Sequence, residues 1–188
     1  GIAAWQAILS SASFWISMVQ SQTLPVQATA DAMANTDFAG FGGAAIFLRI
    51  LRLVSAEVSL SEAKAHWSRV GTDMQRHLAV WELLAQFILT SCMVAHLPCN
   101  RGRVKMHQGT DNSAADAAAA KGITMTTGMA RIIAPYFLYM RRWHVYAEIT
   151  HIPGHLNDLA DSLSRFEPPS CPLDPAAQQK IDWRNLTI

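Results

Sequence analysis

The chain has 188 residues, of which 51% are hydrophobic and only 15% are charged. These proportions exclude a disordered tail and predict one domain with a sizeable core plus extensions. The formal net charge of +1 gives no general attraction for nucleic acid, so nucleic-acid binding would need a local basic patch. Three cysteines do not make a disulfide framework. We therefore expect an intracellular, reducing compartment, with nothing to distinguish nucleus, cytoplasm and organelle.

The first residues predict a helix that precedes the main domain. Apolar residues recur at helical spacing between Ala3 and Val19, and Pro25 then breaks the pattern. We assign residues 1–25 to this lead-in helix. Its polar residues and its lack of a basic start argue against a signal peptide and against a membrane span. Because the chain begins with Gly1, we expect a processed product or a segment of something longer.

An antiparallel meander is predicted next. Its three extended segments are residues 26–34, 44–53 and 56–67. Residues 35–43, which include three glycines, are predicted to form a loop between the first two segments.

Helices and strands then alternate along the chain. The predicted elements are a helix with one apolar face over 78–92, a strand over 103–107, a helix over 114–120 closed by Gly122, a long helix over 125–143 kinked at Pro135, and a strand over 145–151. This order indicates an α/β fold. Four prolines after Glu167 predict an extended arm over residues 167–188.

The segment from His151 to Arg165 combines a strand end, a turn and a helix. Pro153 and Gly154 are typical of the turn. Asn157 and Asp161, four residues apart, share one face of the following helix, so an imidazole and a carboxylate converge at the carboxyl end of a strand. The alternative interpretation is a capped surface helix with solvated acids.

Four acids fall at element ends or against an apolar face: Asp31, Glu82, Asp111 and Asp161. A mixed sheet with this order of elements can bring them together. Four carboxylates in one cleft repel unless raised pKa values or a hard cation neutralise them. Magnesium prefers oxygen ligands, and two ions about 4 Å apart would activate a water and stabilise the leaving oxygen of a phosphodiester.

A soft-metal site is a second, weaker alternative. Cys92, His96 and Cys99 lie at spacings of four and three near the end of one predicted helix. Pro98 breaks the helical spacing, and buried cysteine on a helix ordinarily packs in the core. Core packing is therefore the favoured interpretation.

From about Ala28 to Arg165 the chain resembles ribonuclease H domains of the kind fused to reverse transcriptases in retroelements, of the tyrosine-recombinase or LTR type. Four stretches carry the resemblance in order: Ala30-Asp31-Ala32 with the glycine turn at 40–43, Trp81-Glu82-Leu83-Leu84-Ala85, Thr110-Asp111-Asn112-Ser113-Ala114, and the His-x5-Asn-x3-Asp spacing of His151, Asn157 and Asp161. The sequences His-Ile-Pro-Gly and Ala-Asp-Ser-Leu-Ser-Arg most resemble those of retroelement ribonuclease H domains.

The resemblance implies a ribonuclease H-like domain over residues 26–166, with a five-stranded mixed sheet in which strands 4 and 5 lie parallel to strand 1. It implies that Asp31, Glu82, Asp111 and Asp161 are catalytic and hold two Mg²⁺ ions, with Mn²⁺ as an alternative. His151 would assist proton transfer or product release. The implied reaction is hydrolysis of the RNA strand of an RNA–DNA hybrid, leaving a 3′ hydroxyl.

Substrate contacts are assigned to Asn157, which would orient the loop of His151, and to Asn112, Arg141 and Arg142. A solvated helix end explains the arginine pair at least as well as phosphate contact. Because the domain is weakly basic, we expect it to depend on a neighbouring polymerase or other subunits that contact the lead-in helix and the arm. The alternative function is a catalytically silent, retroelement-derived domain that serves as a structural or interaction subunit of a larger assembly.

Overall fold

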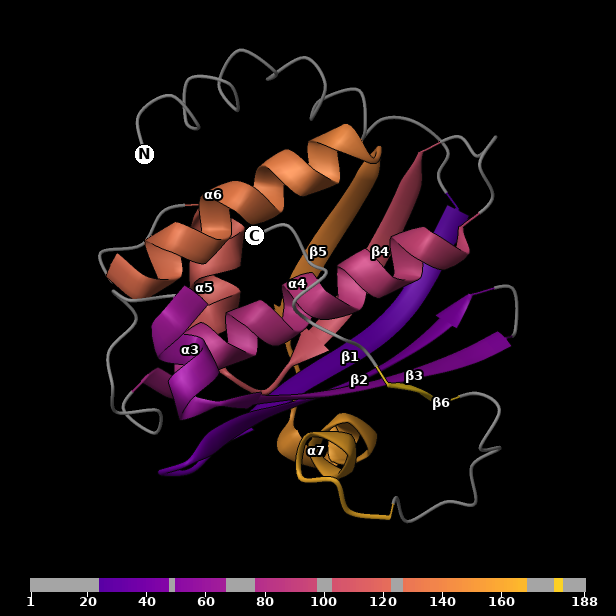
Figure 1. The fold of residues 1–188 in the computed structure, drawn as a ribbon. Coiled ribbons are helices and arrows are strands. Elements are labelled where there is room, and N and C mark those ends of the chain that lie inside the picture. Colours follow the sequence, from indigo (N-terminus) through magenta and orange to yellow (C-terminus); the bar gives the residue numbers. More distant parts are fainter. Residues whose placement is uncertain are drawn as a thin grey trace.

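A mixed sheet forms the centre of the molecule (Figure 1). The computed structural model describes residues 24–47, 50–66, 77–97, 103–122, 127–168 and 178–180. Within them the strands are β1 (Leu24–Ala34), β2 (Phe38–Phe47), β3 (Ile50–Ser59), β4 (Val104–Thr110), β5 (Val145–His151) and β6 (Gln178–Lys180). The lead-in helix predicted over residues 1–25 lies outside the described residues, apart from the last two, which begin β1.

The strand order is β5-β4-β1-β2-β3-β6. β1, β2 and β3 pair antiparallel as a meander, while β4 is parallel to β1 and β5 is parallel to β4. This arrangement confirms the predicted five-stranded mixed sheet. The sequence did not indicate β6, a three-residue strand of the C-terminal arm that pairs in parallel with β3 and extends the sheet by one strand.

The predicted bounds of the second and third strands of the meander were wrong, because the segment predicted over 44–53 covers the end of β2 and the start of β3. Residues 38–43, predicted as loop, belong to β2. The tight turn lies before them, where the Asn35 side chain accepts hydrogen bonds from the N–H groups of Asp37 and Phe38 at 2.8 and 2.9 Å. The glycines in this segment serve close packing instead of turning, because glycine in a strand lets another backbone approach.

The second half of the predicted strand at 56–67 is a helix, α3 (Leu60–His66). Ser59 and Glu62 cap its start reciprocally: Glu62 Oε2 accepts from the Ser59 N–H at 3.1 Å, and the Ser59 hydroxyl oxygen accepts from the Glu62 N–H at 3.3 Å. The pair Ser-x-x-Glu is a capping box, which is visible in the sequence and outweighs the apolar pattern that suggested a strand.

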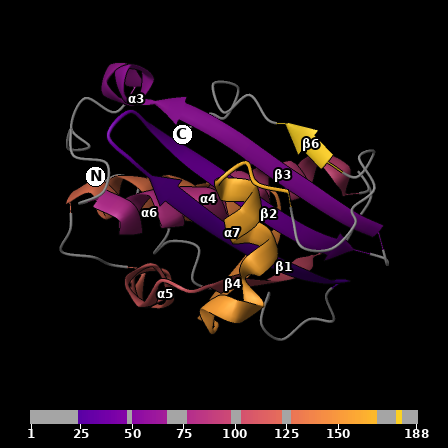
Figure 2. The ribbon, with the colours of Figure 1, turned by 90° about the horizontal axis from the view of Figure 1, so that it is seen from below.

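Helices cover both faces of the sheet. They are α4 (Leu78–His96), α5 (Ser113–Lys121), α6 (Thr127–Arg142) and α7 (Asp158–Ser164), the last preceded by a 3₁₀ turn, η2 (Gly154–Leu156). α7 lies on one face, and α4 with α6 lies on the other (Figures 1 and 2). β2 shows the alternation directly, because Gly42 faces α7 whereas the Phe41 ring packs against Trp81 of α4.

α4 is the core helix of the domain. Its residues from Val80 to Val94 are buried between the sheet and α6. Phe87 stacks on Tyr136 of α6 with ring centroids 5.0 Å apart. α4 is long and apolar enough to cross a membrane, but 83% of its most apolar window is buried inside the domain, as expected for a core helix.

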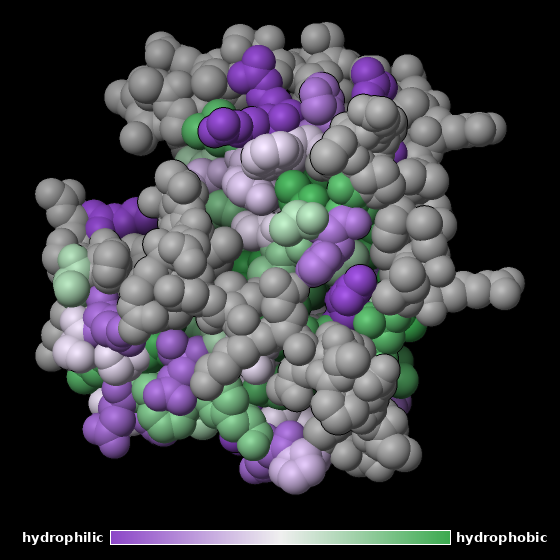
Figure 3. Space-filling view, turned by 45° about the vertical axis from the view of Figure 1, so that its right-hand side comes forward, coloured by the Kyte–Doolittle hydropathy of each residue, from purple (hydrophilic) through white to green (hydrophobic). Residues whose placement is uncertain are grey.

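The described part of the surface shown in Figure 3 carries no continuous polar stripe. Hydrophilic side chains form separate groups between apolar ones on this face. Large apolar residues are also exposed at several separate positions: Ile46, Leu78, Trp143, Leu156 and Phe166. The pattern agrees with the low charged fraction of the sequence.

We expect the substitution Gly42→Ala to destabilise the fold strongly. An added Cβ would overlap the carbonyl oxygen of Ala160 and the amide nitrogen of Ser164, so α7 would have to move off the sheet. The expected cost is about 3 kcal/mol in the free energy of unfolding, measured by urea denaturation. Gly154→Ala is the control, because its Cβ would meet only Asp111 Oδ2 at 3.6 Å. Equal stability of the two variants would contradict this view of the α7 packing.

Candidate metal centre

The site lies where β1 and β4 separate. The two strands pair in parallel from Leu24 and Val104 up to Thr29 and Gly109. β4 then ends at Thr110, while β1 continues to Ala34. The fork between them lies at the carboxyl end of β4, where open α/β sheets place their sites.

A buried amide occupies this fork. Gln86 of α4 is fully buried, and its Nε2 donates to the carbonyl oxygens of Ala30 and Gly109 at 3.2 and 3.1 Å. The next residue of β1 is Asp31, and Asp111 follows the end of β4. The sequence did not indicate a role for Gln86, because a single amide on an apolar helix forms no recognisable motif.

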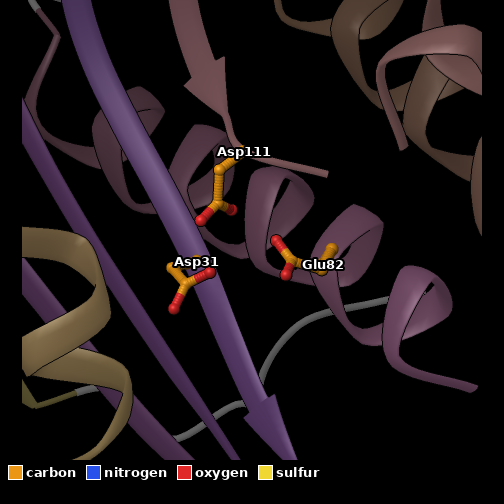
Figure 4. Close-up of side chains that lie close together, drawn as sticks. All are labelled: Asp31, Glu82 and Asp111. Carbon is orange, nitrogen blue, oxygen red and sulfur yellow. The ribbon is translucent and has the colours of Figure 1, made fainter. Parts of the chain in front are cut away.

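Three carboxylates converge just beyond the fork. Asp31 comes from β1, Glu82 from the first turns of α4 and Asp111 from the end of β4, and Figure 4 shows them pointing toward one another. One carboxylate oxygen of each lies within 4.8 Å of the others. Asp31 and Glu82 are each only 4% exposed, whereas Asp111 is exposed, so the group opens to solvent on the Asp111 side.

The electrostatics of this group suit a hard cation. The pKa of Asp31 is raised to about 7, chiefly by burial and also by the neighbouring Asp111 and Asp161, and a hydrogen bond from Ser164 opposes this rise. The pKa of Glu82 is raised to about 9, again chiefly by burial, with smaller contributions from Asp31 and Asp111. Burial, with a smaller contribution from the neighbouring acids, favours the protonated forms of Asp31 and Glu82. A divalent cation with oxygen ligands would replace those protons, so the residues fit such an ion.

Asp161, the fourth predicted ligand, lies beside this group but faces another partner. Its Oδ1 accepts a hydrogen bond from Arg165 Nε at 2.8 Å, one turn along α7. Asp161 is nevertheless near enough to raise the pKa of Asp31. Ser164, which the sequence analysis did not single out, links α7 to the site by donating to Asp31 Oδ2 at 3.0 Å.

Asn157 contacts the site, and His151 lies at the end of the neighbouring strand β5. His151 pairs with Thr110 at the end of the sheet and is exposed. The N–H of Ile152 donates to the Thr110 carbonyl at 2.8 Å and ties the following loop to β4. Asn157 is fully buried, and its Nδ2 lies 3.5 Å from Asp111 Oδ1. Asn157 is therefore brought to Asp111 itself.

Of the other predicted substrate contacts, Asn112 adjoins Asp111 in the chain but uses its side chain elsewhere, and the two arginines lie at the end of α6. The Asn112 side chain caps α5, accepting from the N–H groups of Ala114 and Ala115 at 3.0 and 3.2 Å. Arg141 and Arg142 end α6, so they lie near the start of β5, whereas His151 lies at its other end. Phosphate contact by these arginines stays a prediction.

The alternative soft-metal site gains no support. Cys92 is buried, and burial raises the pKa of its thiol to about 12, which disfavours the thiolate that a soft metal needs. Cys99 lies outside the described residues. Among the residues that the structure describes, Asp31, Glu82 and Asp111 are the one group of three such side chains placed to hold an ion.

Comparison with known proteins rests on structure alone, because no protein-family model and no curated sequence matches the chain. The structure is similar to RNase H1 from the halophilic archaeon Halobacterium salinarum NRC-1, with 14% identity and a TM-score of 0.51 over 75% of this chain and 95% of that one. It is also similar to LC11-RNase H1, solved in complex with an RNA/DNA hybrid, with 14% identity and a TM-score of 0.51 over 76% and 95%. The likeness to a foamy viral protease-reverse transcriptase, with a TM-score of 0.43, is too loose to support an argument. The strand order, the mixed pairing and these superpositions together confirm that the chain has the ribonuclease H fold.

Proposed function

We propose that the chain is a metal-dependent endonuclease that hydrolyses the RNA strand of RNA–DNA hybrids. The convergence of Asp31, Glu82 and Asp111 at the β1–β4 fork carries this proposal. The fold supports it, because the similar LC11-RNase H1 was solved in complex with an RNA/DNA hybrid. Burying the two carboxylates of Asp31 and Glu82 is costly unless a cation pairs with them, which favours a metal-binding role.

We assign two Mg²⁺ ions to the site, with Mn²⁺ as an alternative. Asp31, Glu82 and Asp111 would hold them, and Asp161 would join when Arg165 releases it. Bound ions of this kind activate a water molecule and stabilise the leaving oxygen of a phosphodiester. An all-oxygen set of ligands agrees with Mg²⁺ rather than with a soft metal.

The protein groups around the carboxylates have distinct roles in this proposal. Asp31 and Glu82 form the buried wall of the site, and the exposed Asp111 faces the substrate. Asn157 fixes the direction of Asp111 through its amide. His151, exposed at the end of β5, would give a proton to the leaving 3′ oxygen or assist product release. Selection of RNA would rest on contacts to its 2′ hydroxyl groups.

We further propose that the domain belongs to a retroelement-derived reverse transcriptase. The sequence of the motif from His151 to Arg165 supports this context. The low fraction of charged residues also supports it, because it suits a domain whose surface is covered by neighbouring domains. The lead-in helix and the arm would contact the polymerase or other subunits, which would supply the grip on the hybrid. Part of the arm already pairs with this domain, as β6 against β3.

A panel of labelled duplexes tests the proposed activity. We expect the purified chain to cut the RNA strand of an RNA–DNA hybrid in Mg²⁺, leaving a 3′ hydroxyl, and to spare the DNA strand, duplex DNA and duplex RNA. EDTA should stop the reaction and added Mg²⁺ should restore it. Binding of Mg²⁺ without any cleavage, together with stable incorporation into a large assembly, would favour the silent structural subunit instead.

A further inference from the structure

We propose that Gln86 is a positioning residue that sets the width of the β1–β4 fork, and with it the separation of the carboxylates on the two strands. The inference deepens the proposed function and rests on it in naming the carboxylates as metal ligands. Gln86 itself touches neither an ion nor a substrate in this account. It acts through the backbone that carries Asp31 and Asp111.

The contacts of the amide place it at the point of separation. Its Nε2 donates to the Ala30 carbonyl at 3.2 Å and to the Gly109 carbonyl at 3.1 Å. The parallel ladder between the strands stops at Thr29 and Gly109. One nitrogen therefore bridges the two strands at the place where strand-to-strand pairing ends.

The side chain suits this position for a chemical reason. Two carbonyl oxygens meet at a buried fork, and leaving a buried acceptor without a partner costs about 1–3 kcal/mol. A primary amide carries two N–H groups on one nitrogen, so it satisfies both carbonyls at once without adding charge. The opposite orientation of the amide would set Gln86 Oε1 against both carbonyl oxygens. The unpartnered Oε1 of Gln86 is the cost of directing both donors at the fork.

α4 holds the amide in place and couples it to the third carboxylate. Glu82 lies one turn before Gln86 on the same helix face. The Gln86 carbonyl accepts from the Thr90 hydroxyl at 3.0 Å and lies 3.4 Å from Gln108 Nε2 of β4. Thr90 in turn lies 2.8 Å from the Tyr136 hydroxyl of α6. This buried network joins the turn of α4 that carries Gln86 to β4 and α6.

The variant Gln86→Met tests the inference, because methionine has a similar length and no donor. We expect its affinity for Mn²⁺, measured by calorimetry on the chain alone, to fall about 10- to 100-fold, as when a group that orients metal ligands is lost. Amide hydrogen exchange should accelerate in residues 104–110 and 28–34. Gln86→Asn keeps the amide but is one methylene shorter, so it should weaken Mn²⁺ binding in the same direction if Gln86→Met does not fold.

Ser91→Ala is the matched control. Ser91 is buried on the same helix and donates to the Phe87 carbonyl at 3.0 Å, away from the fork. Its loss should lower stability without changing Mn²⁺ affinity or exchange at the fork. Unchanged Mn²⁺ affinity in folded Gln86 variants, or an equal drop in Ser91→Ala, overturns the inference. Both readouts are taken without substrate, so a wild type that binds Mn²⁺ but cuts no hybrid overturns the nuclease proposal alone.

Discussion

The substitution Asp111→Asn is expected to abolish cleavage of RNA–DNA hybrids while leaving the fold intact. Asp111 is the exposed member of the three carboxylates, so the isosteric amide costs little packing. It removes the negative charge that the proposed ions need, and we expect the cleavage rate to fall at least about 1,000-fold, since metal ions supply several kcal/mol of transition-state stabilisation. The measurement is the single-turnover rate on a labelled hybrid in saturating Mg²⁺.

Asp116→Asn provides the control for this result. Asp116 lies in the first turn of α5, close to Asp111 in the sequence, and is partly exposed. The substitution removes the same charge as Asp111→Asn does. We expect its rate to stay within about 3-fold of the wild type, since no transition-state interaction is lost. Equal losses in both variants would indicate a general charge effect and would contradict a specific role for Asp111.

The substitution Asp31→Asn is expected to stabilise the metal-free protein at pH 8 while destroying activity. The folded-state pKa of Asp31 is raised to about 7 and that of Glu82 to about 9, mainly by burial. The unfolded chain has ordinary values near 4. Between about pH 4 and pH 9 the folded state therefore binds more protons than the unfolded state, so the free energy of unfolding of the wild type falls as the pH rises.

The neutral amide at position 31 removes one source of this pH dependence. It can still accept the hydrogen bond that Ser164 donates to Asp31. Removing the buried charge should raise the free energy of unfolding by about 1–3 kcal/mol at pH 8. This corresponds to a melting temperature about 2 to 12 °C above the wild type at pH 8, and to a smaller difference at pH 5. Thermal unfolding followed by circular dichroism in EDTA measures it. A variant that melts at or below the wild type at pH 8 would show that the carboxylates do not strain the fold.

Magnesium should reverse the order of the two proteins. A ligand that binds the folded state raises its stability in proportion to the logarithm of its concentration. The wild type should therefore gain in melting temperature in millimolar Mg²⁺, and Asp31→Asn should gain much less. The carboxylates that destabilise the metal-free fold are thus the same groups that bind the ion.

Elements with local signals could be predicted from the sequence, and those defined by distant packing could not. The bounds of β5 match the prediction, and α5 ends at Lys121 with Gly122 as its C-cap, in the left-handed conformation with φ 61°. The first half of β2, residues 38–43, was predicted as loop because glycines in a strand resemble a turn until α7 is seen to pack on Gly42. α3 was missed although its capping box at Ser59 was visible.

The candidate site shows the same division. Asp31, Glu82 and Asp111 could be predicted because each stands at an element end or beside an apolar face, and the structure brings them together. The pairing of Asp161 with Arg165 follows the four-residue helical spacing and was available in the sequence. The role of Gln86 could not be predicted from the sequence, because it depends on the register at which β1 and β4 separate.

The most direct test of the account is a crystal structure of the chain soaked in Mn²⁺, whose anomalous scattering locates the ion. We predict density bridged by Asp31, Glu82 and Asp111, about 2.1 Å from carboxylate oxygens. A saturating soak that leaves this position empty while ions bind elsewhere would contradict the central claim that the fork between β1 and β4 is a metal centre.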